Sequence, residues 1–424
     1  MIDIRTWIEK NGEQVEFGSI SGPDVLSAVF RYQESYLNSS ESKAVSISLP
    51  LQKEAFTPGQ TRNFFEGLLP EGFTRRTVAS WMRVDELDYL SILTGLGNEC
   101  IGAIRICRAG EQPPVAGYEK LSARRVKELA AEGATKSAEI VTEAHLSLAG
   151  ASGKIGLFYH EGQWYLPKGS APSTHIVKQS HVRYESIVVN EQLSLSCAGK
   201  MGIEVPKSFI INVGDASDKD VLFASERYDR VFENAGHIDG LPCPNRLHQE
   251  DFAQALGIAS IDKYESDPSQ DYLARMFELL RKYSANPIED QLKLWEIVVY
   301  NYLLGNTDSH IKNYALLYGR DLNGIRLAPA YDILSTCVYD GCTRNLPYSV
   351  NGKYNILEIT REDFERTAAR CGISRKIAMK RFDDLSENFE KNLLEAAAQL
   401  KEIGFQNVDD ICRRILSLPI SARH

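Results

Sequence analysis

The sequence predicts an α+β protein made of a leading α+β subdomain, a small β-rich lobe and a larger helical lobe. Three observations lead to this prediction. The segment GEQPPVAG at 110–117 is typical of a linker, because its two prolines disrupt helices and central strands. Short β-type runs bounded by Gly, Pro or Ser fill 144–230, and amphipathic runs of helical length follow after about residue 245. We therefore expect domains at 1–110, 111–240 and 241–424.

The leading subdomain mixes short apolar runs with turns. It ends in a strand-like run, CIGAIRIC at 100–107, and RNFFEGLL at 62–69 has the spacing of a short amphipathic helix. In the β-rich lobe we expect strands at 146–150, 155–160, 163–167, 174–179, 208–214 and 221–231. A helix is expected within 184–202, with Gly202 as its stop. This order predicts a small sheet with a single helix packed on it.

The last part of the chain is predicted to be mainly helical. Apolar residues recur at helical spacing in 250–257, 270–284 and 289–305, and again in 361–372, 374–398 and 407–417. A short strand pair, NYALLYG at 313–319 and GIRLAP at 324–329, interrupts them.

Composition narrows the functional class. The chain has 424 residues, of which 43% are hydrophobic and 25% charged, so it has the composition of an ordinary soluble globular protein. Its net charge of −9 argues against a protein whose main task is to coat nucleic acid. No stretch approaches the ~18 apolar residues of a membrane span, and no signal peptide is apparent. The eight cysteines are scattered without a CxxC pair, so we expect a cytoplasmic protein with reduced core cysteines.

The segment Gly305–Asn313 carries the densest polar chemistry and follows an apolar helix. Asp308 and Asn313 have the D-x-x-x-x-N spacing of a phosphotransfer loop, where Asp orients a substrate hydroxyl and Asn binds Mg²⁺. Asp332 follows the strand pair and could return beside Asn313, which would complete a site of the oxygen ligands that Mg²⁺ prefers. An Asx-rich turn and a helix N-cap are the alternative interpretations.

The β-rich lobe holds candidate nucleotide-binding residues. Lys178 lies in a short strand, and Glu191 on the next helix could pair with it, although an edge-strand lysine pointing to water is the alternative. Small residues in a strand-to-strand turn allow backbone amides to approach an anion, although an ordinary hairpin turn has the same composition: Ala149, Gly150, Ala151, Ser152, Gly153 and Lys154. The hinge segment, 226–230, would offer backbone groups to adenine, or else forms a charged loop. The order of these features favours a phosphotransferase.

With these residues assembled, the chain resembles the HipA family of bacterial serine/threonine-kinase toxins along nearly its whole length. Residues 1–108 are similar to the N-terminal subdomain of that family. The resemblance implies a bilobal protein-kinase-like fold of the PI3/4-kinase type, with a β-rich N-lobe and a helical C-lobe. The motifs that carry it are LSLAGASGKIGLF (146–158), PKGSAPSTHIVK (167–178), ERYDR (226–230), RLHQEDFAQALG (246–257), KYESD (263–267), NTDSHIKN (306–313) and PAYDILS (329–335).

The resemblance also implies roles for single residues. Asp308 matches the catalytic aspartate, and Asn313 and Asp332 match the magnesium ligands. Lys178 matches the lysine on the ATP phosphates. The other residues expected at ATP are the turn 149–154 and Glu226, Arg227, Tyr228, Gln249, His310, Lys312 and Tyr331.

Regulation and partners are implied in the same way. Ser147 matches the family's autophosphorylated serine, whose modification ejects the glycine loop, and Ser152 is a candidate second site. The resemblance implies a growth-arresting toxin that uses ATP and Mg²⁺ to phosphorylate a translation component such as an aminoacyl-tRNA synthetase. A HipB-like helix-turn-helix antitoxin would neutralise it and carry it to operator DNA.

Other functions remain as alternatives. A small-molecule kinase shares the D-x-x-x-x-N pattern, and a non-catalytic co-repressor scaffold could use the same lobes, although intact Lys178, Asp308, Asn313 and Asp332 argue against a scaffold. Lys380 and Arg381, with Arg375 and Lys376, form a basic cluster on one predicted helix. That cluster is a candidate DNA contact, and a solvated helix face is the alternative.

Overall fold

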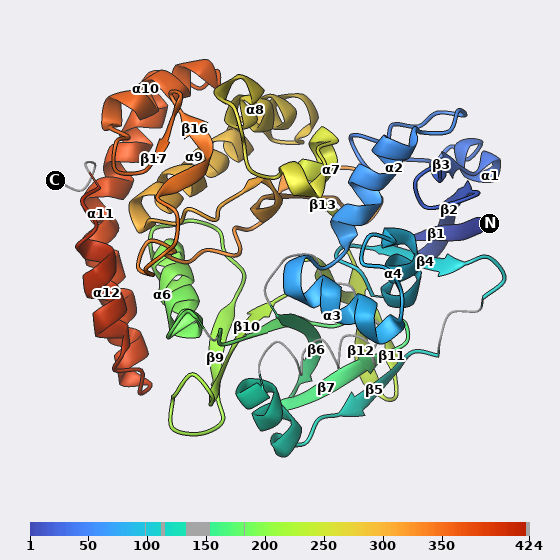
Figure 1. Cartoon of the computed structure of the whole chain (residues 1–424), viewed down its shortest axis with the longest axis horizontal. Helices are drawn as coiled ribbons and strands as arrows, with labels where there is room; N and C mark the ends of the chain where they lie inside the picture. The colour runs from blue at the N-terminus through green and yellow to red at the C-terminus, as the bar shows by residue number, and fades with distance from the viewer. Residues whose placement is uncertain (98, 112–114, 133–152, 182, 421–424) are drawn as a thin grey trace.

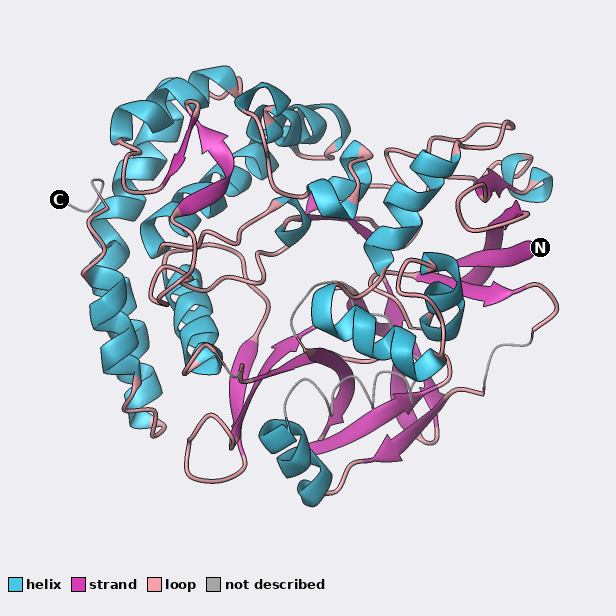
Figure 2. Ribbon diagram, viewed as in Figure 1, coloured by secondary structure: helices cyan, strands magenta, loops and turns pink. Residues whose placement is uncertain are grey.

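Three groups of elements surround one central pocket in the computed structural model. The structure describes residues 1–97, 99–111, 115–132, 153–181 and 183–420. The helices of the C-terminal part gather on one side of the molecule, and most strands lie on the other (Figure 2). The mixed α/β architecture expected from the sequence is therefore observed. The N-terminal subdomain lies beside both the β-rich lobe and the helical lobe (Figure 1).

The N-terminal subdomain is an antiparallel sheet of order β3-β2-β1-β4 covered by short helices. Its strands are β1 (Ile2–Lys10), β2 (Glu13–Gly22), β3 (Val29–Tyr32) and β4 (Ile104–Arg108), and its helices are α1 (Glu34–Leu37), α2 (Pro58–Phe65), the 3-10 turn η1 (Glu66–Leu68), α3 (Gly72–Met82) and α4 (Tyr89–Leu96). Helix α2 begins earlier than the predicted residue 62, because Thr57 and Gln60 form a capping box and Pro58 occupies the first turn.

The β-rich lobe is a six-stranded sheet of order β5-β7-β6-β8-β10-β9. Its strands are β5 (Gly117–Lys120), β6 (Lys154–His160), β7 (Gln163–Lys168), β8 (His175–Gln179), β9 (Ser208–Asn212) and β10 (Val221–Glu226), and the predicted helix is α6 (Ile187–Lys200). The prediction of a single helix was wrong. Side chains of β10 alternate between two cores, and the face of Leu222 and Ala224 is covered by a second helix, seen over 123–132, through Val126 and Leu129.

A β-hairpin connects this sheet to the helical lobe. It consists of β11 (Arg230–Ile238) and β12 (Leu241–Arg246), which pair with each other. The predicted boundary at 240/241 falls in its turn, where Asp239 and Gly240 adopt positive φ. The expected strand pair is confirmed as β14 (Ala315–Leu317) and β15 (Arg326–Leu327), and a third strand, β13 (Gln249–Asp251), adds to β14.

The helical lobe packs around α9 and α11. Its helices are α7 (Phe252–Leu256), α8 (Tyr272–Tyr283), α9 (Pro287–Leu304), α10 (Arg361–Arg370), α11 (Arg375–Glu402) and α12 (Val408–Leu416), with the 3-10 turns η2 (Ser260–Asp262), η3 (Pro268–Gln270) and η4 (Ile311–Asn313) and the hairpin β16 (Asn345–Val350) and β17 (Lys353–Asn355). The predicted helix at 374–398 is confirmed and continues to Glu402. One hydrophobic core joins this lobe to α6 and to the N-terminal subdomain.

Two further features concern the cysteines and the length and hydrophobicity of the helices. All eight cysteines are free, and five of them are buried. Among the residues that the structure describes, no helix is both long and apolar enough to cross a membrane.

Candidate active site

A pocket of about 950 Å³, its open mouth included, lies where the three parts of the chain meet. The β-rich lobe contributes Lys154 and Lys178, the helical lobe contributes Asn313 and Asp332, and the N-terminal subdomain contributes Gly67 and others. The predicted site residues that line it are Lys154, Lys178, Glu226, Arg227, Tyr228, Gln249, His310, Lys312, Asn313, Tyr331 and Asp332. Residues far apart in the sequence therefore converge here as predicted.

Lys178 bridges the two walls of the pocket. Its Nζ lies 2.5 Å from Oε1 of Glu191 on α6 and also contacts Oδ1 of Asp332 in the helical lobe. Strand β8 points the lysine inward between buried neighbours, and its antiparallel partner on β6 is Lys154. The predicted Lys178–Glu191 pair is thus present, and the edge-strand alternative is wrong because the side chain is only 12% exposed.

Lys178 and Asp332 hold each other ionised. Burial lowers the pKa of Lys178, but Asp332 and Glu191 outweigh this and raise it above its usual value. Burial would raise the pKa of Asp332, yet Lys178 and Lys154 hold it well below the usual range. Burial lowers the pKa of Lys154, and Asp332 opposes that effect. The pocket therefore combines two lysines with an ionised aspartate, a charge pattern suited to phosphates and a cation.

Asp332 is placed by a strained turn. Its φ of 56° lies in the left-handed region, which is uncommon for residues other than glycine. The amide of Ala330, two residues earlier, donates to the Glu204 carbonyl at 2.8 Å and fixes the chain that leads into the turn. The backbone conformation thus directs the Asp332 side chain to Lys178 at a local cost in strain.

The loop after α9 is held by its own side chains. Gly305 ends the helix with φ 77°, and a Cβ there would lie 2.7 Å from Leu418 Cδ1, so glycine is required. Asn306 Oδ1 accepts from the Asp308 amide at 3.1 Å. Asn313 Nδ2 donates to the Asp308 carbonyl at 2.7 Å, which joins the two residues of the D-x-x-x-x-N pattern.

Asp308 lies at the rim of the pocket beside Tyr264. The Tyr264 hydroxyl donates to Asp308 Oδ1 at 2.5 Å, and Glu265 fixes that segment by accepting from the Ser349 amide at 3.0 Å. Asp308 has an exposed edge, but the surrounding chain withdraws its carboxyl from solvent and raises its pKa above 3.8. The hydrogen bond from Tyr264 opposes this rise.

Three other predicted residues line the pocket in different ways. The Lys312 ammonium is 2.8 Å from Asp251 Oδ2, so it already has a carboxylate partner. Tyr331 donates from its hydroxyl to the Lys312 carbonyl at 2.9 Å. His310 is buried, which keeps its pKa well below the usual value and its ring neutral.

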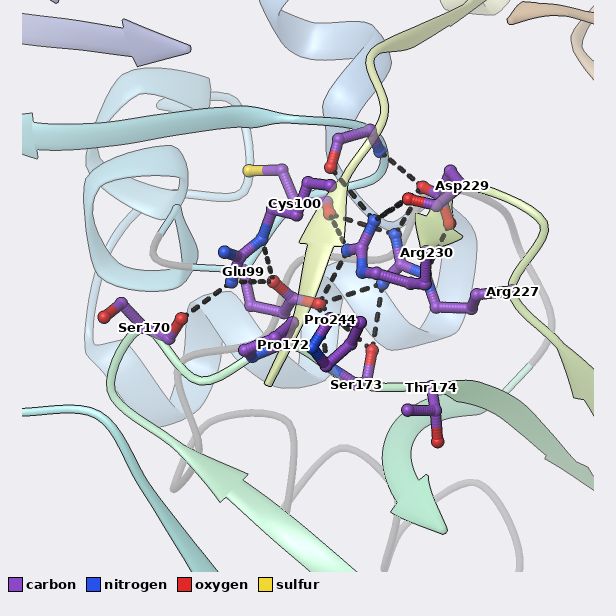
Figure 3. A network of polar contacts seen from close by, with 12 residues as sticks. Glu99, Cys100, Ser170, Pro172, Ser173, Thr174, Arg227, Asp229, Arg230 and Pro244 are labelled. Carbon is purple, nitrogen blue, oxygen red and sulfur yellow. Dashed lines mark hydrogen bonds and ion pairs between the residues drawn. The ribbon is translucent and has the colours of Figure 1, made fainter. Parts of the chain in front are cut away.

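In the hinge segment, the Arg227 side chain lies in a buried network and the Tyr228 side chain lies in the pocket wall. The amides of Glu226 and Arg227 donate to the carbonyls of Lys207 and Thr174, each at 2.8 Å. The Arg227 side chain enters a buried network (Figure 3), so what this residue offers the pocket is its backbone, the part that the hinge prediction concerned. Tyr228 donates to Gln249 Oε1 at 2.5 Å within the pocket wall.

Some predicted residues are not part of the described pocket. Ser147, Ala149, Gly150, Ala151 and Ser152 lie outside the described residues, and Gly153 directly precedes β6 without lining the pocket. In the basic cluster on α11, Arg381 is 2.8 Å from Glu296 and Arg375 is 2.5 Å from Glu365. These pairs neutralise half of the cluster, whereas Lys376 and Lys380 are exposed. The Arg381 and Arg375 side chains remain 50% and 62% exposed, so direct DNA contact by this cluster stays a prediction.

Several pocket residues were missed by sequence reasoning. They include Gly67, Leu68, Ile101, Asp251 and Gln254. Asp251 and Gln254 form the capping box that begins α7, and the D-x-x-Q spacing was their signal. No sequence pattern indicated that Gly67, Leu68 and Ile101 line the pocket, because their position there depends on how the N-terminal subdomain packs against the two lobes.

The donor set fits a magnesium ion held jointly with a ligand. Among the residues that the structure describes, no group of three or more His, Cys, Asp or Glu side chains could hold a metal by itself. Asn313 uses its amide nitrogen on the Asp308 carbonyl, which leaves its side-chain oxygen for a cation, and Asp332 is ionised. Two oxygen donors beside phosphate oxygens suit Mg²⁺, which keeps several non-protein ligands.

Comparisons with known proteins agree along the chain. Residues 146–393 match the family model described as the HipA-like C-terminal domain, and residues 13–107 match the HipA N-terminal domain. A protein of Sinorhizobium fredii named "Putative kinase Y4mE" is 30% identical, over 88% of this chain and 86% of that protein. The serine/threonine-protein kinase toxin HipA of Shewanella oneidensis is 24% identical, over 84% of this chain and 81% of the toxin.

A solved structure shows the same fold. It is the complex of Shewanella oneidensis HipA with HipB and operator DNA, in which one chain matches this one with a TM-score of 0.78. The match covers 98% of this chain and 96% of that chain at 21% sequence identity.

Proposed function

Because the chain belongs to the HipA family, we propose that it is an ATP-dependent serine/threonine-protein kinase that acts as a growth-arresting toxin. The observation that carries this proposal is the contact of Lys178 with both Glu191 and Asp332 across one pocket. A strand lysine paired with a helix glutamate, opposite an aspartate that follows a D-x-x-x-x-N loop, is the arrangement that protein kinases use. Relatives named as kinases support the same activity.

The proposed roles follow from charge and position. Lys178 and Lys154 would bind phosphate oxygens, and the backbone of Glu226 and Tyr228 would meet adenine. Asp308 would accept the proton of the acceptor hydroxyl. Asn313 and Asp332 would hold Mg²⁺, which neutralises phosphate charge when it is bound.

The partners follow from the family relationship. The structural neighbour was solved with HipB and operator DNA, which supports a HipB-like antitoxin as a partner of this chain. Operator DNA would then be reached mainly through that antitoxin, consistent with a net charge of −9 and a half-neutralised basic cluster. We further propose a cytoplasmic protein whose substrate is a translation component such as an aminoacyl-tRNA synthetase.

We expect the purified protein to carry phosphate on Ser147 as a result of autophosphorylation. The phosphate adds about −1.5 to −2 charge, which would repel ATP phosphates and silence the kinase. Intact-mass spectrometry should find phosphate on the purified protein and none on the Asp308→Asn variant, and mass spectrometry of peptides from the purified protein should place that phosphate on Ser147. Phosphate that persists on the variant would contradict autophosphorylation.

The proposed kinase activity can be tested with a variant that lacks Ser147. A Ser147→Ala variant, freed from self-inactivation, should transfer label from ATP to a specific protein in a cell lysate. Mass spectrometry of the labelled band identifies the substrate. Label found only in free metabolites would instead support a small-molecule kinase.

Removal of the Tyr264 hydroxyl should change the pH dependence of the reaction. The hydrogen bond from Tyr264 lowers the pKa of Asp308, so a Tyr264→Phe variant should have a higher Asp308 pKa. A base works only when deprotonated, and its activity is lost as pH falls through its pKa. The acidic limb of the kcat profile should therefore move to higher pH. The plateau should fall by less than about tenfold, short of the 10²–10⁴ expected for loss of a general base.

The control for this experiment is Tyr283→Phe. Tyr283 is an exposed tyrosine at the end of α8, 39% accessible, and its variant should keep the wild-type profile. A limb that stays in place or moves to lower pH in Tyr264→Phe would show that Tyr264 does not act on Asp308.

A further inference from the structure

A buried network of three arginines and three carboxylates lies between the N-terminal subdomain and the hinge segment, and Figure 3 shows the part of it around Glu99, Arg227, Asp229 and Arg230. Each of the six side chains is at most 7% exposed. Formal charges balance at three positive and three negative. The members are Glu9, Glu99, Arg227, Asp229, Arg230 and Arg246.

Glu99 joins all three arginines of this network. Its Oε1 lies 3.1 Å from Arg227 NH1 and 2.8 Å from Arg230 NH2. Its Oε2 accepts from Arg246 at 3.0 Å and 2.7 Å. The Ser173 amide also donates to Oε1 at 3.0 Å. Burial would raise the pKa of Glu99, but the three guanidinium groups outweigh that effect and keep the carboxylate ionised.

From Glu99 the contacts lead to the pocket by way of the hinge. The Arg227 guanidinium is clamped between Glu99 and Asp229, which accepts from it at 2.9 Å and 2.8 Å. Asp229 Oδ2 also accepts from Gln249 Nε2 at 3.0 Å, and Gln249 accepts from Tyr228. The residues that flank the nucleotide pocket are therefore held from behind by charge-assisted hydrogen bonds.

A second contact with the N-terminal subdomain reinforces this arrangement. The Gly102 amide donates to Asp229 Oδ2 at 2.9 Å. Gly102 has φ 74°, and a Cβ there would lie 2.9 Å from the Gln249 amide nitrogen, so only glycine permits this approach. The N-terminal subdomain thus reaches the hinge through the Glu99 carboxylate, the Gly102 amide, and the carbonyls of Cys100 and Gly102, which accept from the hinge arginines.

We propose that Glu99 is a positioning residue that sets the hinge segment for the adenine end of the nucleotide. The N-terminal subdomain then forms part of the nucleotide site, although Glu99 itself does not line the pocket. Loss of the Glu99 charge leaves Arg227 with one carboxylate instead of two, and a buried guanidinium short of partners shifts to find others. The Arg227 backbone moves with it. The inference rests on the proposed function, because it assumes that adenine binds at the hinge.

The test compares two ligands on the full-length chain, with every variant made in the Ser147→Ala background so that no phosphate on Ser147 interferes with ATP binding. Calorimetry would measure binding of a non-hydrolysable ATP analogue and of inorganic tripolyphosphate, which carries the phosphates without the base. Glu99→Gln should weaken binding of the analogue about tenfold, or ~1.4 kcal/mol, and leave the affinity for tripolyphosphate unchanged. Ser173→Ala removes only the hydroxyl that accepts from Arg227 NH1 at 2.9 Å, and it should weaken the analogue less.

Glu9→Gln is the matched control. Glu9 is also buried in this network, 7% exposed against 0% for Glu99, but it contacts Arg246 and not the hinge arginines, so its variant should leave the ratio of the two affinities unchanged. The inference would be overturned if the folded Glu99→Gln variant lost affinity for both ligands equally. It would also be overturned if the affinity of this variant for the analogue were unchanged. If Glu99→Gln does not fold, unchanged analogue affinity in Ser173→Ala overturns it. A Ser147→Ala chain with no other change that fails to bind the analogue refutes the proposed function instead.

Discussion

Replacing Asp308 with asparagine should abolish phosphate transfer while nucleotide binding persists. The asparagine keeps the size of the side chain and can still accept from Tyr264, but it cannot take the proton of an acceptor hydroxyl. Loss of a general base costs about 10²–10⁴-fold in rate. Asp308 does not line the pocket, so the affinity of the variant for an ATP analogue should match that of Ser147→Ala, which also carries no phosphate on Ser147. Transfer of labelled phosphate and calorimetry measure the two effects separately.

The control for this change is Asp340→Asn. Asp340 is an exposed acid of the same lobe and lies outside the pocket, so its variant should keep full activity. Residual transfer within tenfold of wild type in Asp308→Asn would show that Asp308 is not the base. Loss of nucleotide binding in the same variant would show that it acts on the loop structure instead.

The sequence predicts best where chemistry depends on local spacing. Asp308 and Asn313 share one loop, and the hydrogen bond between them follows from five residues of separation. Lys178 and Glu191 lie on adjacent elements of one lobe, so their pairing also follows from short-range order. Residues of this kind come together once the neighbouring helices, strands and loops form, so their contacts can be predicted from the sequence.

Side-chain direction and long-range packing escape prediction. The hinge position of Arg227 was foreseen, but its guanidinium pairs with Glu99, a residue 128 positions away. Lys312 was expected at ATP, and Asp251 on a different element pairs with it. The helix over 123–132 was missed because its apolar positions, Val126 and Leu129, are few among charged residues. In each case the deciding partner is brought by the tertiary fold.

Replacing Lys178 with methionine should affect stability and catalysis together. The change leaves Glu191 and Asp332, side chains 7% and 24% exposed, facing each other without their shared cation. Breaking a buried ion pair on one side costs about 3–5 kcal/mol. Without the lysine charge the pKa of Asp332 should rise, because Lys178 is the largest influence that lowers it. Phosphate transfer should fall by about 10²–10³-fold, the usual cost of one group that stabilises transition-state charge.

A double variant separates the two effects. Lys178→Met with Glu191→Gln removes one of the two facing charges and leaves Asp332 beside Lys154, so the melting temperature should recover in part. Phosphate transfer should not recover, because the ammonium that binds phosphate is still missing. The control is Lys168→Met, in strand β7 of the same sheet, whose pair with Glu119 is surface-exposed at 33% and 46% and contributes about 0–1 kcal/mol. Recovery of transfer in the double variant would mean that Lys178 only neutralises Glu191, and that phosphate binding falls to another cation such as Lys154.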